Sequence, residues 1–328
     1  MNSRDARIGV VGATGAVGTV TLRLLRERGY RNVRPFASAR SAGRQLESGL
    51  TVEEATPEAL AAGGLDLVLF SCGTSASRVL VPPAVEGGAL VVDKSSAYRL
   101  ADGYPLVVPE VNGDRAAEAI ETTRVVANPN CSAIPLTCVL KPLHDAAGLR
   151  RVRLSTYQAV SGAGAHRMES LRSESPEEHD LEFDWTWEGD ETEEEAKIRA
   201  EARKILELPQ LPLSATTVRV PVLVGHAQSV WVETEEPLSP EQTESVLAAA
   251  PSVRIVETPT PRGAAQTEDV LIGRIRPDRA AEKNGLVLFL ACDNLVKGAA
   301  LNALQIAELL LAPRLAEPQA DDQALIGT

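Results

Sequence analysis

The chain has 328 residues, and at roughly 150 residues per domain this length predicts two domains. A formal net charge of −12 argues against nucleic acid as a partner, because binding nucleic acid requires a basic surface. No apolar run of about 18 residues occurs, so we predict no membrane span. The first apolar stretch lacks the features of a signal peptide, and we expect a cytoplasmic protein.

The 4 cysteines are scattered along the chain and form no Cys-x-x-Cys pair. They therefore signal neither a zinc site nor a disulfide framework, and we predict no metal site. Most are expected to be small buried side chains, and one is a candidate reactive thiol. These residues are Cys72, Cys131, Cys138 and Cys292.

The first 130 residues alternate between short apolar runs and helical patterns, which predicts a Rossmann-like, doubly wound parallel sheet. One helix is predicted from about Gly15 to Arg28, with Gly29 as its C-terminal cap. The predicted strands are Ile8–Val11, Val33–Ala37, Leu65–Phe70, Leu90–Val92 and Val125–Ala127.

The second half has longer strand-like runs, which predict a mixed or antiparallel sheet in an α+β domain. These runs are Val152–Gln158, Ser229–Glu233, Val270–Ile275 and Leu286–Ala291. An acidic stretch from Glu174 to Glu207 ends in a predicted helix, Glu193–Leu206. A strongly apolar helix is predicted at Ala299–Leu311, and the composition of the tail after it favours disorder.

A glycine-rich segment of the form Gly-x-x-Gly-x-x-Gly directly follows the first predicted strand and opens a helix. Glycines there allow a tight turn, and backbone N–H groups at the positive helix end can bind a pyrophosphate. The segment therefore predicts a dinucleotide site, although the motif alone is weak evidence and a plain turn is the alternative. The predicted contacts are Gly12, Thr14, Gly15, Ala16, Val17 and Gly18.

The end of the second predicted strand indicates which dinucleotide binds. An NAD site usually has an acidic residue there, which holds the ribose hydroxyls. Here the chain has Ser38, Arg40 and Ser41 instead, and a guanidinium between hydroxyls suits a 2′-phosphate. We therefore predict NADP as cofactor, with a solvated polar loop as the alternative.

Cys131 lies in the segment Asn128–Ser132, after a predicted strand and before an apolar helix-like run. A cysteine at a helix N-terminus has a lowered pKa, because the helix dipole stabilises the thiolate. Ligands of such sheets also bind where the strands end. The residues alone leave an inert buried cysteine and a nucleophile both open.

The sequence resembles the aspartate-semialdehyde dehydrogenases over nearly its whole length, to about residue 311. The resemblance rests on several ordered segments with similar spacing, which together are far more specific than any one of them. They are GATGAVG at 12–18, SARSAG at 38–43, SSAYR at 95–99, PNCS at 129–132, YQAVSGAG at 157–164, EEEAKIRAEARKIL at 193–206, RVPVLVGH at 219–226 and DNLVKGAALNALQIAE at 293–308.

The resemblance implies a role for each matching residue. Cys131 corresponds to the nucleophile, His226 to the acid/base and Gln158 to the residue that orients the substrate. Arg219 corresponds to the partner of the substrate carboxylate, and Glu195 to the contact of its amino group. Further matches are Arg99 and Lys197 for phosphate, Asn130 for the oxyanion, and Ser161, Gly162, Asn294 and the region of Gly298 for the nicotinamide half of the cofactor.

Two lysines leave alternatives open. Without the resemblance, the spacing favours Lys197 as a helical surface charge paired with Glu193 or Glu201. Lys94 stands where many members of the family have Asn, and it either assists phosphate binding or points to solvent.

The implied reaction is the reversible, NADP-dependent conversion of L-4-aspartyl phosphate to L-aspartate 4-semialdehyde and inorganic phosphate through a Cys131 thioester. The family further implies a homodimer and a place in diaminopimelate, lysine, threonine and methionine biosynthesis. We expect residues 1–130 plus about 300–328 to form a discontinuous NADP-binding domain, and residues 131–299 to form the catalytic and dimerisation domain.

Several other classes of protein compete with this interpretation. N-acetyl-γ-glutamyl-phosphate reductases share the chemistry, but their cysteine segment usually resembles PGCY more than PNCS. Glyceraldehyde-phosphate dehydrogenases usually have an acidic ribose contact. A non-catalytic NADP-binding scaffold would not need the reactive residues, and a cysteine hydrolase would not need the glycine-rich segment.

Overall fold

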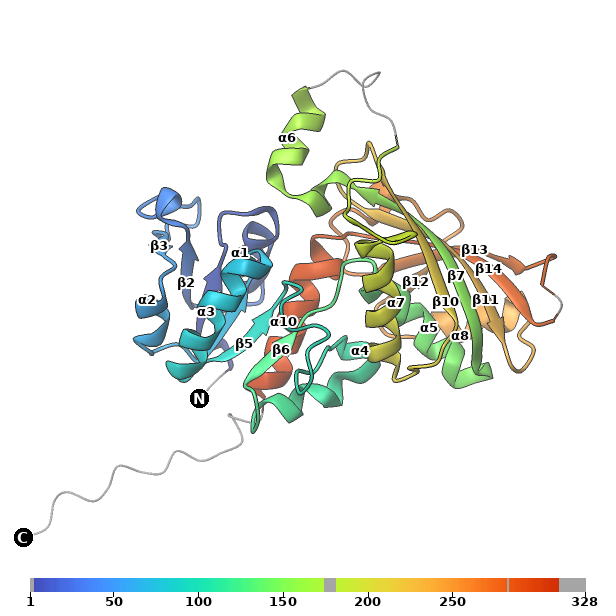
Figure 1. Cartoon of the computed structure of the whole chain (residues 1–328), viewed down its shortest axis with the longest axis horizontal. Coiled ribbons are helices and arrows are strands. Elements are labelled where there is room, and N and C mark those ends of the chain that lie inside the picture. The colour runs from blue at the N-terminus through green and yellow to red at the C-terminus, as the bar shows by residue number, and fades with distance from the viewer. Residues whose placement is uncertain (1–2, 174–180, 282, 313–328) are drawn as a thin grey trace, which may run out of the picture.

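The computed structural model describes residues 3–173, 181–281 and 283–312. Two six-stranded sheets lie side by side, the first blue to cyan and the second green to orange (Figure 1). The predicted tail after residue 312 and the start of the acidic stretch, 174–180, lie outside the described residues. No helix of the described part of the chain is long and apolar enough to cross a membrane.

The first sheet is parallel throughout and has the strand order β3-β2-β1-β4-β5-β6, which is the order of a Rossmann fold. Its strands are β1 (Arg7–Val11), β2 (Asn32–Ala37), β3 (Glu53–Glu54), β4 (Leu67–Phe70), β5 (Leu90–Asp93) and β6 (Val125–Ala127). The helices of this half are α1 (Ala16–Glu27), α2 (Pro57–Ala61), α3 (Thr74–Glu86) and α4 (Pro109–Asn112), with 3₁₀ turns η1 (Ser3–Asp5), η2 (Ala39–Ser41) and η3 (Gly113–Ala119). The five strands predicted in this half are present, with ends shifted by at most two residues.

The second sheet is mixed and has the order β10-β7-β11-β14-β13-β12. Its strands are β7 (Leu149–Ala159), β10 (Leu213–Val220), β11 (His226–Thr234), β12 (Val253–Ile255), β13 (Val270–Pro277) and β14 (Gly285–Cys292). The predictions missed β10, because its Ser and Thr residues weaken the apolar pattern, although buried and less buried positions alternate along it. The fold class, a Rossmann-like parallel sheet plus a domain with a mixed sheet, is confirmed.

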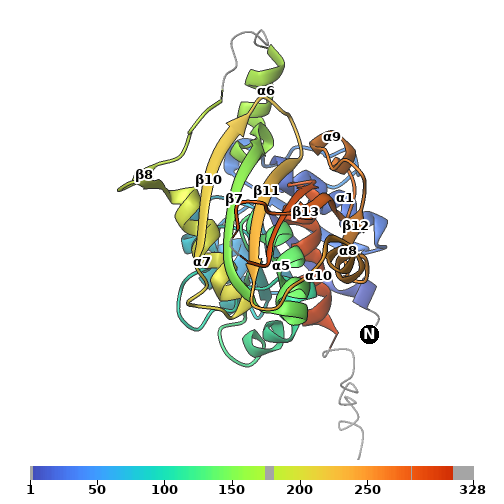
Figure 2. The same ribbon diagram turned by 90° about the vertical axis from the view of Figure 1, so that its right-hand side faces the viewer.

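Helices cover one face of the second sheet. In Figure 2 the strands β10, β7 and β11 lie in front, with α5 (Ala133–Ala147) behind them. Apolar residues of α5, α7 (Glu193–Leu206) and α8 (Pro240–Ala248) join those of the strands in one core. The remaining elements are the 3₁₀ turn η4 (Val160–Ala163), the helices α6 (Ala165–Ser173) and α9 (Pro261–Ala264), and the short hairpin β8 (Trp187–Glu188) and β9 (Glu191–Thr192).

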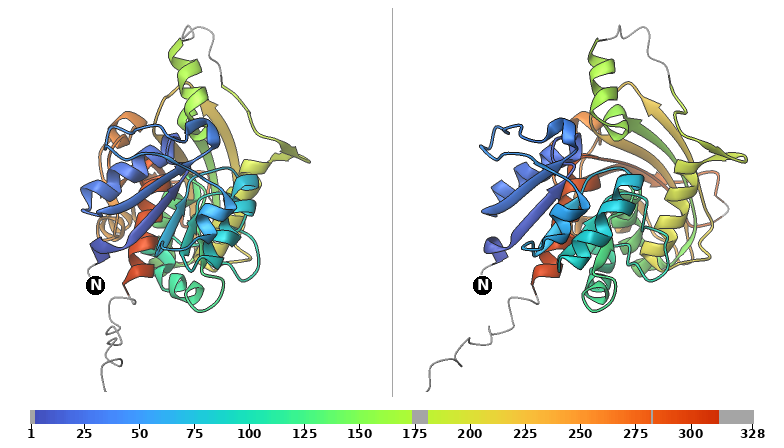
Figure 3. Two further views of the ribbon diagram at one scale, coloured as in Figure 1. Left: turned by 90° about the vertical axis from the view of Figure 1, so that its left-hand side faces the viewer. Right: turned by 60° about the vertical axis from the view of Figure 1, so that its left-hand side comes forward.

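The end of the described chain returns to the first sheet. The predicted helix at Ala299–Leu311 begins as a π-helical turn, η6 (Val296–Ala300), and continues as α10 (Leu301–Leu311). Residues of α10 share a buried core with β1, β4 and β5, and the red helix lies against the first sheet in Figure 3. Residues 293–300 therefore connect β14 of the second sheet to α10, which packs on the first sheet.

Candidate active site

A cavity of about 270 Å³ lies where the two sheets face each other. The register places Val11, Phe70, Asp93 and Ala127 level with one another at the carboxyl ends of β1, β4, β5 and β6. Ligands of open α/β sheets bind at this edge. The first half of the chain contributes Val17, Ser71, Cys72, Lys94, Arg99 and Asn128 to the cavity wall, together with Pro129, Asn130 and Cys131. The second half contributes Gln158, Ser161, Gly162, Trp185, Glu194, Arg219, Asn294, Leu295, Gly298 and Ala299.

The glycine-rich segment 12–18 fits the phosphates of a dinucleotide. Gly12 has φ +82°, and a Cβ there would lie 2.3 Å from Ser71 O. A Cβ on Gly18 would lie 2.1 Å from Gly12 O, so the helix can approach the loop this closely only with glycine. Gly15 is the N-cap of α1 and offers no side-chain cap, which leaves the N–H groups of the first turn to an anion.

Ser38, Arg40 and Ser41 lie on the turn that follows β2, beside the glycine-rich segment. Ser38 and Arg40 are exposed, and within the described residues the Arg40 guanidinium forms no ion pair. None of the three lines the cavity that holds Cys131. A second ligand phosphate can therefore reach this turn from solvent.

Cys131 and His226 meet although they are 95 residues apart. Cys131 Sγ lies 3.3 Å from His226 Nε2. Ala159 N donates a 3.0 Å hydrogen bond to Nδ1, so the proton of the neutral imidazole is on Nε2 and faces the sulfur. Burial, together with the Arg219 cation, lowers the pKa of His226 to about 3, which keeps the ring neutral.

The Cys131 thiol is not acidic in this state. Burial raises its pKa to about 12, and the charge of Glu194 acts in the same direction, whereas Arg219 and Arg99 oppose it. This raised pKa is contrary to the lowered value predicted from the helix N-terminus.

Glu194 lines the cavity, whereas Glu195, the residue predicted from the sequence, does not. Glu194 Oε1 accepts hydrogen bonds from Asn130 Nδ2 at 3.0 Å and from Gln158 Nε2 at 3.1 Å. Glu195 is occupied elsewhere: its oxygens accept from the backbone N–H groups of Thr192, at 2.7 Å, and Thr217, at 2.8 Å. It caps α7 and ties the helix to β10.

Arg219 enters the cavity from β10, where the register pairs it with Gln158 on β7. Its Nη1 donates to Ala159 O at 3.0 Å, and its Nε donates to Asp184 Oδ2 at 3.2 Å. The Trp185 ring covers the guanidinium, with its centroid 4.5 Å from Cζ. The guanidinium keeps free N–H donors on the side of the cavity.

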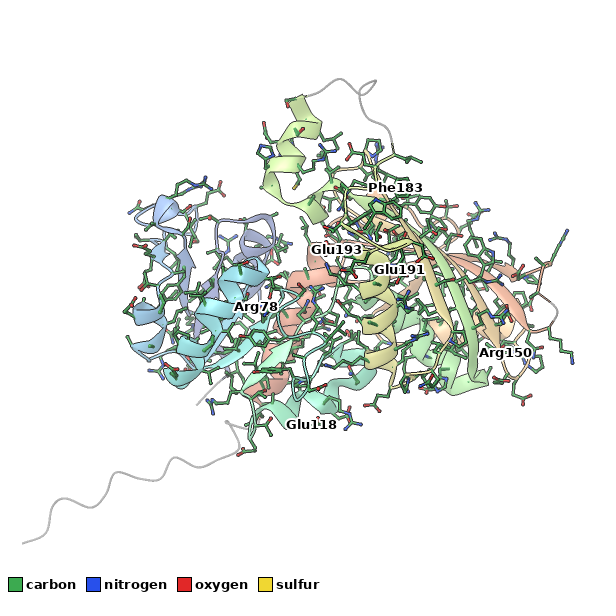
Figure 4. All side chains as sticks on the ribbon, in the orientation of Figure 1. Arg78, Glu118, Arg150, Phe183, Glu191 and Glu193 are labelled. Atoms are coloured by element: carbon green, nitrogen blue, oxygen red, sulfur yellow. The ribbon has the colours of Figure 1, made fainter. Side chains whose placement is uncertain are left out.

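The two predicted phosphate ligands are not brought together in this state. Arg99 lines the cavity, and its guanidinium donates to Glu201 Oε1, Asn128 O and Lys94 O. Lys197 instead forms an ion pair with Glu193 at 3.0 Å and does not line the cavity. Glu193 and Glu191 lie at the N-terminal end of α7, with Phe183 above them (Figure 4).

The predicted nicotinamide contacts Ser161, Gly162 and Asn294 all line the cavity beside Cys131, where Ser161 and Asn294 are buried and Gly162 is exposed. Asn294 Oδ1 accepts hydrogen bonds from Gly225 N at 2.9 Å and Ser161 Oγ at 3.1 Å, which fixes the amide. A Cβ on Gly162 would lie 3.1 Å from Arg219 Nη1.

Comparison with known proteins identifies the class first. Residues 7–119 match the family model of the semialdehyde dehydrogenase NAD-binding domain. Residues 140–186 and 183–297 match that of the semialdehyde dehydrogenase dimerisation domain. The fold and the cavity therefore belong to an oxidoreductase of the semialdehyde dehydrogenase class with a Rossmann domain for a nicotinamide cofactor.

Full-length relatives narrow the class to one family. The chain is 43% identical to an aspartate-semialdehyde dehydrogenase of Mycolicibacterium smegmatis over 93% of this chain and 99% of the relative. It is 41% identical to that of Aquifex aeolicus over 93% of this chain and 98% of the relative. The structure of aspartate semialdehyde dehydrogenase II from Vibrio cholerae complexed with ASA superimposes with a TM-score of 0.88 at 35% identity, over 94% of this chain and 98% of the other. The chain belongs to the aspartate-semialdehyde dehydrogenase family.

Proposed function

We propose that the protein catalyses the reversible, NADP-dependent reductive dephosphorylation of L-4-aspartyl phosphate to L-aspartate 4-semialdehyde. The observation that carries the proposal is the 3.3 Å approach of Cys131 Sγ to His226 Nε2 in a cavity at the carboxyl ends of a dinucleotide-binding sheet. A thiol so placed can form a thioester, which stores the energy of the acyl phosphate. NADPH, when bound, supplies the hydride for this chemistry.

The charges of the cavity match both ends of an amino acid. Arg219 presents guanidinium donors to the α-carboxylate. Glu194 presents its carboxylate to the α-ammonium, in the role first predicted for Glu195. Gln158, which holds Glu194 and lines the same wall, orients the substrate over Cys131.

Substrate binding also activates the nucleophile in this proposal. Glu194 raises the pKa of the Cys131 thiol, so pairing Glu194 with an ammonium ion favours the thiolate. The Nε2–H of His226 then donates a hydrogen bond to the sulfur. For the predicted acid/base role, His226 must move its proton to Nδ1, which the N–H of Ala159 opposes in this state. The backbone at Cys131 stabilises the oxyanion, and Asn130 contributes only if its amide leaves Glu194, to which its Nδ2 donates.

Phosphate binds at Arg99 in this proposal. Its guanidinium lies in the cavity wall and has donors beyond those given to Glu201 and the backbone. Lys197 can bind the same phosphate only if its side chain leaves Glu193. The ion pair between the two lies on the surface and contributes little free energy.

The cofactor assignment extends the predictions from the sequence. Gly12, Gly15 and Gly18 surround the pyrophosphate, with contacts from Thr14, Ala16 and Val17. The exposed guanidinium of Arg40, between Ser38 and Ser41, binds the 2′-phosphate and so selects NADP. Ser161, Gly162 and Asn294 contact the nicotinamide half.

We also propose a homodimer in the cytoplasm that serves diaminopimelate, lysine, threonine and methionine biosynthesis. The match to a dimerisation domain supports the homodimer, as does the sheet face opposite α5, on which Tyr157 is exposed. We propose the domain division that the sequence predicts, with residues 1–130 plus about 300–328 as the NADP-binding domain and residues 131–299 as the catalytic and dimerisation domain. The packing of α10 on the first sheet supports this division.

One assay tests the substrate. Purified protein should reduce NADP with aspartate semialdehyde only when phosphate is present, and should not accept N-acetyl-glutamate semialdehyde. The physical reason is Glu194, which attracts a free ammonium group and gains nothing from an acetylated amine. The opposite preference would identify an N-acetyl-γ-glutamyl-phosphate reductase.

A further inference from the structure

Lys94 presents a second cation to the cavity, beside Arg99. It directly follows β5 and lines the cavity together with Arg99 and Cys131. Its backbone carbonyl accepts a 2.6 Å hydrogen bond from Arg99 Nη2, so the two cationic residues are held as one unit. Neither the proposed reaction nor the comparisons assign this lysine a role.

The ammonium group of Lys94 has few partners within the protein. Its Nζ donates to Thr21 Oγ1 on α1 at 3.2 Å, and the hydroxyl of Thr21 donates in turn to Val17 O at 2.9 Å. An ammonium group has three donors, and no carboxylate of the described residues forms an ion pair with this one. The adjacent Asp93 forms no ion pair with this ammonium group, and its oxygens accept hydrogen bonds from Ser77 and Ser95.

A cation without an ion-pair partner in the wall of a cavity favours an anionic ligand. Burial lowers the pKa of Lys94 to about 7, although the charges of Asp93 and Cys72 oppose this, so a bound anion would stabilise the charged form of the lysine. The hydrogen bond to Thr21 places the ammonium beside α1, whereas Arg99 contacts the backbone carbonyl of the same lysine. The side chain of Lys94 therefore extends from the proposed phosphate site to the cofactor helix.

We infer that Lys94 binds phosphate oxygens in the cavity as a positioning cation that acts with Arg99. The inference rests on the proposed function for the source of that phosphate. One source is inorganic phosphate, or equally the phosphoryl group of the acyl phosphate. The other source is the pyrophosphate of the cofactor, which shares the same chemistry.

The test compares Lys94→Met, which removes the charge and keeps the length, with Lys94→Arg, which restores a charge. Lys141→Met is the matched control, since Lys141 pairs with Asp145 on the surface of α5 and does not line the cavity. We expect Lys94→Met to raise the KM for inorganic phosphate about 10-fold or more, the value of a charge-assisted hydrogen bond. Lys94→Arg should recover part of this loss, and Lys141→Met should behave as the parent.

Two further measurements separate binding from a structural effect. At a given concentration, inorganic phosphate alone should raise the Tm of the parent and of Lys141→Met by more than that of Lys94→Met. The ratio of KM values for phosphate, Lys94→Met over parent, should fall as the pH rises above 7, because the parent loses its charge and the titration of phosphate cancels in the ratio. A structural defect alone would leave this ratio independent of pH.

The two sources give different outcomes. A raised KM for phosphate with an unchanged NADPH dissociation constant, measured by fluorescence, assigns Lys94 to the substrate phosphate. A weaker NADPH affinity with an unchanged KM for phosphate assigns it to the cofactor. If the parent is active and Lys94→Met changes neither constant, the inference is wrong. If the parent shows no phosphate-dependent activity, the proposed function fails, and the Tm shift still decides the role of Lys94.

Discussion

Gly298 lies directly against Cys131. A Cβ added to Gly298 would lie 3.2 Å from Cys131 Cβ and 3.1 Å from Cys131 O. Gly298 is part of the π-helical turn η6, and such turns are frequent at functional sites. Position 298 therefore requires glycine, because Cys131 occupies the space that a side chain would need.

Replacing Gly298 by Ala should displace the nucleophile. The added methyl group would be tighter against the backbone and Cβ of Cys131 than nine in ten real Cβ contacts, so Cys131 or the turn must move by a few tenths of an ångström. Because misplacement by about 1 Å can cost ~100-fold in rate, we expect this smaller shift to lower kcat by less than that factor, with little change in Tm. Steady-state kinetics and thermal unfolding measure both. Gly164→Ala, in open space outside the cavity, is a control for the loss of a glycine itself, although its positive φ of 99° will lower the Tm. A Gly298→Ala enzyme with parental kcat would contradict the tight contact.

Glu194 and Glu195 form a matched pair that tests the corrected assignment. Glu194→Gln should raise the KM for aspartate semialdehyde and lower the pKa of the Cys131 thiol, because Glu194 raises it. Glu195→Gln should instead lower stability by about 1 kcal/mol through the weakened cap of α7, with a near-parental KM. Kinetics, the pH profile of iodoacetamide alkylation and chemical denaturation report the three quantities. The reverse pattern would restore Glu195 as the ligand.

His226 variants distinguish a hydrogen-bond donor from an acid/base. Loss of general acid/base catalysis typically costs ~100-fold or more, so both His226→Ala and His226→Gln should lose at least that much in kcat. Gln can still donate a hydrogen bond to the sulfur, as the Nε2–H does, so we expect it to retain more activity than Ala. Equal kcat values for the two variants would show that a hydrogen bond from residue 226 to the sulfur contributes nothing to the rate.

A buried ion pair fixes the turn that carries Gly298. Lys297 is fully buried, and its Nζ donates to Glu110 Oε1 at 2.6 Å. Lys297→Met should reduce the free energy of unfolding by about 3–5 kcal/mol, because it leaves the Glu110 carboxylate buried and unpaired. Adding Glu110→Gln should recover much of this loss, as urea denaturation can measure. If the double variant were as unstable as the single one, packing rather than charge would explain the effect.

The same pair makes stability depend on pH. Burial alone would raise the pKa of Glu110, but Lys297, Ser252 and Gln305 lower it below the ordinary value. A carboxyl group with a lowered folded pKa stabilises the protein above its unfolded pKa, about 4.3, and loses that contribution as the pH falls through the folded value. The parent should therefore lose stability below about pH 4.3. Lys297→Met and the double variant differ only at residue 110. Their difference in free energy of unfolding should shrink in acid, because the unpaired Glu110 carboxylate becomes protonated.

The sequence predicted the first sheet well because its strands are short apolar runs bounded by turn residues. The same runs place the glycine-rich segment and Cys131 at one edge, so the location of the cavity followed from pattern alone. Position Glu194 was missed although two signals were present. Thr192 and Glu195 have the spacing of a capping box, which reserves Glu195 for the helix end. Glu194 also shares helical spacing with the buried Ile198, Glu201 and Ile205.

Other features had no signal in the sequence. Trp185 covers Arg219 from an irregular segment, and no periodicity predicts the path of such a segment. The raised pKa of Cys131 depends on burial between two domains, which a helix-dipole argument on the local sequence cannot include. The tautomer of His226 depends on Ala159, 67 residues away on another strand.

Mass spectrometry of the acyl-enzyme tests the central proposal most directly. Protein incubated with aspartate semialdehyde and NADP but without phosphate should accumulate an aspartyl group on the peptide that contains Cys131. Adding phosphate should remove the group, and Cys131→Ser should neither acquire it nor turn over substrate at the parental rate. Parental turnover by Cys131→Ser, or an aspartyl group on a different residue, would contradict the thioester account.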